Sequence, residues 1–277
     1  MLRLLTIEFH KLKHNKASKI LSLIYFGLLI CIALTAAIKF DIGPIKFHLA
    51  EMGIFNFPYI WHFNTYVAAI LKFFLLLVIV SMMANEYSYK TLKQNLIDGL
   101  SKKEFILSKF YTVVAFALAS TFFVFITSLI LGLIYSDYNE FAIITSDLTY
   151  FLAFFIKLIG YFSFGLFLGI LVKRSAFAVG AMLVWYFIEW IIFGILGWKF
   201  VSWETAQSIK NFLPLEAMSN LIKEPGSRLG AVRSIANQIG ETFTKTYAVE
   251  FSTITIVSLW TVIFIYLSLI LLKKRDL

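Results

Sequence analysis

Six long apolar runs decide what this sequence can fold into. Each is long enough to cross the hydrocarbon core of a bilayer as an α-helix, which takes roughly 20 residues. Backbone N–H and C=O groups find no water there, so they must pair within the segment itself. The sequence therefore predicts an all-α membrane protein with a single transmembrane domain over residues 1–277. The expected spans are residues 20–38, 65–84, 110–135, 148–172, 175–198 and 251–272.

The composition supports a membrane protein and the charges indicate its orientation. Hydrophobic residues make up 60% of the chain, against about 45–50% in soluble domains. A net charge of +9 would favour nucleic-acid binding in a soluble protein, but lysine and arginine also gather on the cytoplasmic side of membrane spans. Placing both termini inside puts fifteen of the 25 lysines and arginines on that side. We expect a multi-pass protein of the inner or plasma membrane, and no nucleic-acid partner.

The N-terminal residues 1–19 have the pattern of an amphipathic helix. Apolar side chains recur at helical spacing, while lysines occupy the other faces. Such a helix would lie along the inner leaflet, with its lysines toward anionic headgroups. The apolar positions are Leu2, Leu5, Phe9 and Leu12.

The largest segment expected outside the membrane is residues 199–250. Pro214 suits the first turn of a helix, and an apolar stripe follows it. A second helical pattern covers residues 229–243. We expect two amphipathic helices that cap the outer ends of the spans, although they could instead form a lid over an exit route.

Two charged side chains lie inside predicted spans. Lys157 and Glu189 fall at similar depth in the hairpin formed by the fourth and fifth spans. Charges within a membrane usually pair with each other or face a cavity. The two residues could form a structural pair, or a polar site on a transport path. Lys72, in the second span, is expected to extend its ammonium toward the nearer surface.

The chain has no recognisable catalytic or metal-binding motif. It contains neither GxxxxGK[ST], which binds nucleotide phosphates, nor the metalloprotease motif HExxH. Cys31 is the only cysteine, and no cluster of histidine, cysteine and carboxylate residues occurs at ligand spacing. We therefore predict no catalytic residue, no metal site and no cofactor bound by this chain.

Residues 85–109 form a charged stretch between two spans, with five lysines and three acids in 25 residues. Leu92 and Leu96 recur on one helical face. Gly99 can end a helix, and Ser101 with Glu104 has the spacing of a capping box. The stretch predicts an elbow: a short helix over about 86–98, a break, and a third span starting near residue 102. An ordinary charged loop is the alternative.

The residue order in this elbow resembles the signature region of type-2 ABC transporter permeases, the six-span membrane subunits of bacterial exporters. Lys90 stands where that family has glycine, and Gly99 where it has proline. Glu8, Lys11 and Lys13 resemble the bacitracin and lantibiotic-immunity branch. The matching positions are Glu86, Thr91, Leu96, Ser101 and Lys109, with Lys102 in place of the family's arginine.

The resemblance implies an exporter made of two permeases and two separate ATPase subunits. ATP would bind to the partner ATPase, and this chain would contact that subunit, the bilayer and a second permease copy or homologue. The elbow would dock in a groove of the ATPase, with Glu86 fixing the elbow through its charge or backbone hydrogen bonds and the leucines filling the groove. The residues expected to carry this role are Glu86, Thr91, Leu92, Leu96, Gly99 and Ser101. Two rival functions are an ion-gradient-driven transporter that uses Lys157 and Glu189, and a non-transporting scaffold or sensor.

Overall fold

The fold was analysed in a computed structural model, which describes residues 2–38, 40–42, 45–47, 53–228 and 246–275. Within these ranges six helices are long and apolar enough to cross a membrane, which confirms the predicted all-α class. The long helices are α2 (Lys16–Ala37), α3 (Tyr59–Ser88), α5 (Lys102–Tyr135), α7 (Thr149–Val172), α8 (Ser175–Ile195) and α12 (Phe251–Lys274).

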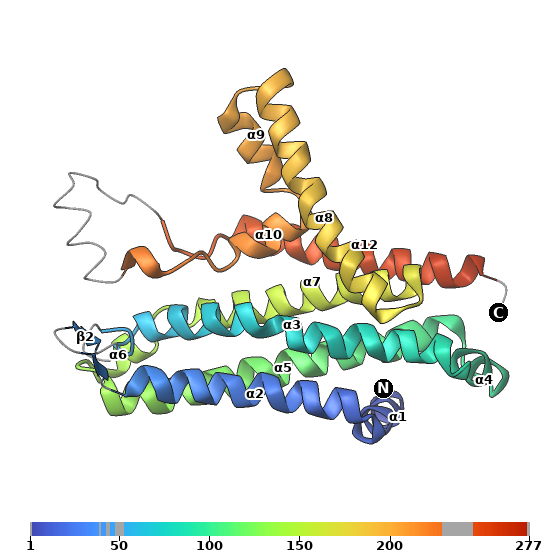
Figure 1. Ribbon diagram of the computed structural model, residues 1–277, viewed down its shortest axis with the longest axis horizontal. Helices are drawn as coiled ribbons and strands as arrows, with labels where there is room; N and C mark the ends of the chain where they lie inside the picture. The colour runs from blue at the N-terminus through green and yellow to red at the C-terminus, as the bar shows by residue number, and fades with distance from the viewer. Residues whose placement is uncertain (1, 39, 43–44, 48–52, 229–245, 276–277) are drawn as a thin grey trace.

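Five of these helices, all but α8, run side by side as an elongated bundle (Figure 1). Both chain termini lie at one end, with the amphipathic helix α1 (Leu2–His14) and the short helix α4 (Thr91–Ile97). We call this the basic end. The opposite end carries α6 (Phe141–Ile144) and a hairpin of β1 (Phe40–Ile42) and β2 (Ile45–Phe47), paired antiparallel with Phe40 opposite Phe47.

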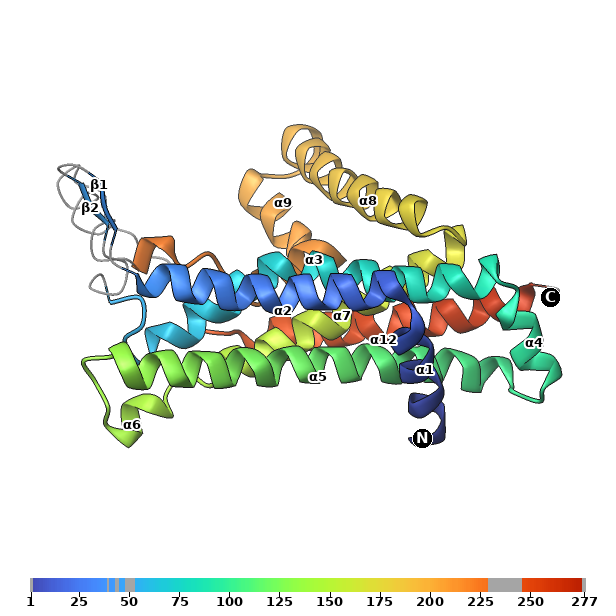
Figure 2. The same ribbon diagram turned by 60° about the horizontal axis from the view of Figure 1, so that its bottom comes forward.

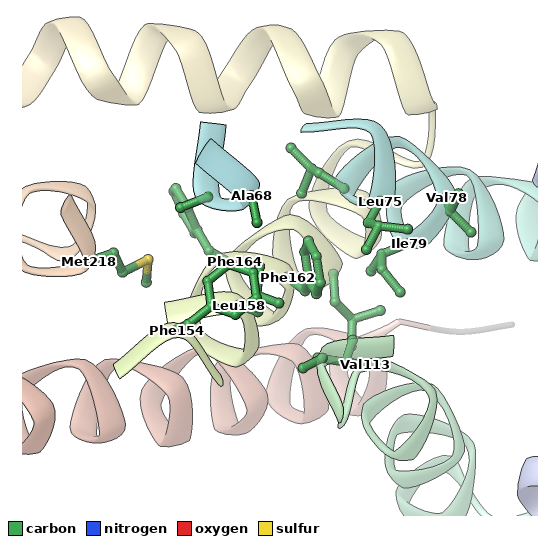
Figure 3. Close-up of a cluster of buried hydrophobic side chains, with 14 of the residues drawn as sticks. Ala68, Leu75, Val78, Ile79, Val113, Phe154, Leu158, Phe162, Phe164 and Met218 are labelled. Carbon is green, nitrogen blue, oxygen red and sulfur yellow. The ribbon is translucent and has the colours of Figure 1, made fainter. Parts of the chain in front are cut away.

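Helix α7 is the centre of the bundle and packs against α3, α5, α8, α10 and α12. Two glycines let it approach α3 closely, as small residues do between membrane helices. A Cβ atom added at Gly165 would overlap the Leu76 side chain, and one at Gly169 would lie 3.2 Å from Cβ of Met83. Figure 3 shows the resulting core, in which Phe154, Leu158, Phe162 and Phe164 of α7 lie beside Ala68, Leu75 and Ile79 of α3.

Helix α8 leaves the bundle. It turns away after α7 and, with α9 (Trp203–Lys210), projects beyond the other helices (Figures 1 and 2). Only Ala178, Met182 and Glu189 of α8 are buried, and most of its large apolar side chains are exposed. Because α8 is as apolar as the packed spans, its sequence does not reveal that it stands apart.

The segment after α8 agrees only in part with the sequence-based expectation. A π-helical turn (Leu196–Phe200) extends α8, and α9, which was not predicted, follows it. Helix α10 (Pro214–Asn220) starts with proline at its first position, as predicted. It packs between α7, α8 and α12, and a 3₁₀ turn (Gly226–Arg228) follows. The second predicted helix, over residues 229–243, lies outside the described residues.

Candidate functional site

The elbow is present, with different boundaries from those expected. Helix α3 continues to Ser88, so the short helix starts at Thr91 rather than near residue 86. Ser101 then begins α5 with the predicted capping box. Its Oγ accepts a hydrogen bond from the Glu104 N–H at 3.2 Å, and the Glu104 carboxylate accepts one from the Ser101 N–H at 2.9 Å.

Left-handed backbone flanks α4 on both sides. Lys90, immediately before the helix, has φ of 57°, and Gly99, just after it, has φ of 97°. Glycine adopts such angles freely, whereas other residues pay about 1–2 kcal/mol for the left-handed conformation. Both are positions at which the elbow differs from the family it resembles. At position 90 the conformation is one that glycine would favour, so lysine forms the same turn at a cost.

Glu86 fixes α4 in place from the end of α3. Its side chain is only 3% exposed, and each of its two carboxylate oxygens accepts two hydrogen bonds. Oε1 lies 2.5 Å from Nζ of Lys109 and 2.8 Å from Nζ of Lys11. Oε2 accepts from the Thr91 hydroxyl at 2.6 Å and from the Asn95 amide at 3.3 Å. One carboxylate thus joins α1, α3, α4 and α5.

A second carboxylate, Glu8 of α1, completes this arrangement. Its Oε2 lies 2.6 Å from Nζ of Lys109, and its Oε1 accepts a hydrogen bond from Ser108 at 3.4 Å. Glu8 and Lys109 are both buried. We call Glu8, Lys11, Glu86 and Lys109 the charge cluster. Two acids balance two lysines, which is the condition under which charges are tolerated away from water. Removing any one member leaves an unbalanced charge.

The outward face of the elbow differs from the face that was predicted to dock. Leu92 is 2% exposed and packs inside the permease, and Leu96 is partly covered. Leu92 therefore cannot fill a groove of a partner in this conformation. The apolar side chains that do face outward are Tyr89 and Ile97, each 74% exposed. The leucine stripe packs against the chain's own core, and the apolar residues off the stripe are exposed.

The C-terminus is attached to the same end of the bundle. The Arg275 guanidinium donates to the Ile170 and Leu171 carbonyls at the end of α7, at 2.5 and 3.0 Å, and to the Tyr87 hydroxyl at 3.1 Å. Lys102, at the start of α5, donates to the Arg275 carbonyl at 3.0 Å. The sequence showed only that these residues are basic, so their contacts with the elbow could not be foreseen.

Lys157 and Glu189 do not form the pair that their depth suggested. Glu189 accepts hydrogen bonds from the Leu215 and Glu216 N–H groups, both at 3.0 Å. Lys157 donates instead to the Ser219 carbonyl at 3.3 Å. The carboxylate is thus at the N-terminus of α10 and the ammonium near its C-terminus, where each charge complements the helix dipole. A short helix inserted between the spans, which the sequence did not reveal, separates the two residues.

Among the described residues, no group of three or more His, Cys, Asp or Glu side chains could hold a metal ion.

Comparison with known proteins identifies the family. A search of curated proteins gave no match. A family model described as "ABC-2 family transporter protein" matches residues 19–277. The match starts within α2 and covers all six long helices, the elbow and α10. The chain therefore belongs to the ABC-2 family of transporter proteins, as a multi-pass membrane permease.

Proposed function

We propose that this permease is the membrane-spanning subunit of an ATP-driven exporter and couples ATP hydrolysis in a separate ATPase subunit to movement of a substrate across the membrane. The observation that carries the proposal is α4, a short helix fixed to three other helices by the charge cluster. Ile97 of α4 and Tyr89, which lies just before α4, are exposed at the basic end. Assignment to the bacitracin and lantibiotic-immunity branch remains a prediction.

The charge cluster gives α4 a means to transmit force. Because Glu86 bonds to Thr91 and Asn95 of α4 as well as to Lys11 and Lys109, a shift of α4 would move the ends of α1, α3 and α5 with it. Breaking a buried ion pair by removing one partner costs about 3–5 kcal/mol. The link would therefore hold while the ATPase pushes on the elbow, and the spans would rearrange as packed units.

The basic end would face the cytoplasm, where ATP is available. The lysines of α1, α4 and the start of α5, together with those at the end of α12, lie at this end. Excess lysine and arginine in short loops is retained on the cytoplasmic side. Both termini would then be cytoplasmic, and ATP would be bound by the partner subunit.

A second permease copy, or a homologue, would cover α8. This helix projects from the bundle with an exposed apolar face that includes Phe187 and Ile191. Replacing Phe187 by cysteine in a Cys31→Ala background would leave one thiol for oxidative cross-linking in membranes, because Cys31 is the only native cysteine. A disulfide-linked dimer would support the contact. Absence of dimer from Phe187→Cys and also from Ile191→Cys would contradict it.

No specific observation supports either of the two rival functions. In an ion-gradient-driven transporter Lys157 and Glu189 would form the coupling site, but each of them binds one end of α10. A scaffold or sensor would use the elbow only for binding. Transport by the chain alone in ATP-free liposomes would favour the ion-driven transporter, and a bound ATPase without ATP-dependent transport would favour the scaffold.

The docking surface is tested by Ile97→Asp. Ile97 is exposed, so the change should leave the fold intact while placing a charge on the proposed contact. The permease would be co-expressed with an ATPase from a neighbouring reading frame and then purified. We expect Ile97→Asp to lose the ATPase, and Phe141→Asp, an equally exposed apolar site at the opposite end, to keep it. Retention of the ATPase by Ile97→Asp would overturn the assignment of this surface.

A further inference from the structure

A cavity of about 210 Å³ lies between α3, α7, α8 and α10, away from the elbow. Its polar lining comes from Lys72 of α3, Lys157 and Tyr161 of α7, Tyr186 of α8 and Ser219 of α10. Two lysines in one cavity of a membrane domain are unusual, because charges are rare within spans and mark binding sites or transport paths there. The elbow and its coupling role make no use of them.

Both lysines lie far from the ends of their helices. Lys72 is 13 residues from the start of α3 and 16 from its end, or about 20 and 24 Å along the axis. Lys157 is 8 residues from the start of α7 and 15 from its end, or about 12 and 22 Å. Lysine side chains that extend to the membrane surface usually lie near the ends of their helices. Their ammonium groups instead remain at the cavity.

The two ammonium groups have no counter-ion among the described residues. Lys157 is 5% exposed, and its ammonium donates a hydrogen bond to the Ser219 carbonyl at 3.3 Å. Lys72 donates to the carbonyl of Ala69, in its own helix, at 2.8 Å and lies 4.6 Å from the centre of the Tyr161 ring. The ion pairs of the described residues involve other lysines. Because an ammonium has three donors, each lysine can bind a further acceptor.

The rest of the cavity wall is apolar. Met182 and Leu183 of α8 and Met218 of α10 line it, and Leu183 continues onto the exposed apolar face of α8. A ligand that matches both the two lysines and the apolar wall would have an anionic head and an apolar tail. The cavity has the volume of about seven water molecules, which is enough for a phosphate group and the first atoms of a tail. Lysine binds phosphate as a compact point charge.

We propose that Lys72 and Lys157 bind the phosphate headgroup of an amphipathic molecule in this cavity, with the tail lying against α8. The site goes beyond the coupling function, and its occupancy does not require the ATPase. The ligand could be an anionic phospholipid of the bilayer or a transported amphiphile. Both sources share the same chemistry, a phosphate attached to an apolar chain.

Binding of dodecyl phosphate to the purified full-length permease in neutral detergent would test the proposal. We expect Lys72→Met and Lys157→Met each to weaken binding by about tenfold or more, as loss of a charged hydrogen bond does. Lys157→Arg should retain most of the binding. The control is Lys103→Met, which removes an exposed lysine at the basic end and should leave binding unchanged.

The inference fails if both Met variants bind dodecyl phosphate as the native chain does, or if dodecyltrimethylammonium binds equally well. Lys157 also holds α10, so Lys157→Met could fail to fold. In that case Lys72→Met decides, since the hydrogen bond of Lys72 lies within its own helix. Two further arms separate the sources of the ligand. Selective retention of phosphatidylglycerol over phosphatidylcholine in native mass spectra indicates a bilayer lipid, and stimulation of the ATPase complex by dodecyl phosphate indicates a transported molecule.

Discussion

Replacing Glu86 by glutamine should destabilise the permease far more than loss of an exposed charge does. Glu86 is 3% exposed and accepts hydrogen bonds from the ammonium groups of Lys11 and Lys109. Each charged hydrogen bond contributes about 1.5–3 kcal/mol. The glutamine oxygen can still accept a hydrogen bond from one lysine, and Lys109 keeps its ion pair with Glu8 at 2.6 Å. Part of the stabilising free energy is therefore retained. We expect a loss of about 3 kcal/mol, at the lower end of the range for breaking a buried ion pair.

The free energy of unfolding can be measured in mixed micelles by titration with sodium dodecyl sulfate, followed by tryptophan fluorescence. Glu250→Gln is the matched control, because Glu250 is 55% exposed and lies 3.1 Å from Lys223. Such an exposed pair contributes about 0–1 kcal/mol. Lys109→Met should be the most costly of the three, since it leaves the buried carboxylates of Glu8 and Glu86 with Lys11 alone. Equal losses for Glu86→Gln and Glu250→Gln would refute the structural role of the charge cluster.

The same unfolding assay tests three other features. Positions 90 and 99 both have left-handed backbone, which glycine adopts without strain. Lys90→Gly should therefore stabilise the permease by about 1 kcal/mol, and Gly99→Ala should destabilise it by a similar amount. Effects of the same sign would contradict this. Gly165→Leu should cost about 3 kcal/mol or prevent folding by overpacking α3 against α7, whereas Gly180→Leu, where a side chain has open space, should cost little. Glu189→Gln should lower the free energy of unfolding by about 1–2 kcal/mol, because it weakens the hydrogen bonds at the N-terminus of α10. Transport per folded molecule should stay unchanged. Lost transport at normal stability would indicate a functional site instead.

The sequence contains the local features of this fold. Some features depend only on residues that are close in sequence, so residue types at fixed spacing predict them. They are the span lengths, the capping box of Ser101 and Glu104, and the helix start at Pro214. The elbow could be recognised for the same reason. The face that it exposes could not be predicted, because the leucine stripe of a short helix does not indicate whether it packs on its own chain or on a partner.

Long-range contacts account for what was missed. Lys109 forms an ion pair with Glu8, 101 residues away in the sequence, and Arg275 donates a hydrogen bond to the Ile170 carbonyl, 105 residues away. Lys157 and Glu189 have similar depth, but α10 lies between them, so depth alone suggested the wrong partner. Lys72 and Lys157 come from different spans, and only the packing of α3 on α7 shows that they line one cavity.

Photo-cross-linking from the elbow tests the central claim most directly. A benzoylphenylalanine residue would replace Tyr89, which is exposed beside α4, or Tyr138, which is exposed at the opposite end. Cells that co-express the permease and its neighbouring ATPase would then be irradiated. A permease–ATPase adduct from position 89 and none from position 138 is the predicted result. An adduct from position 138, or none from position 89 while the two proteins co-purify, would contradict the proposal that the elbow is the coupling site.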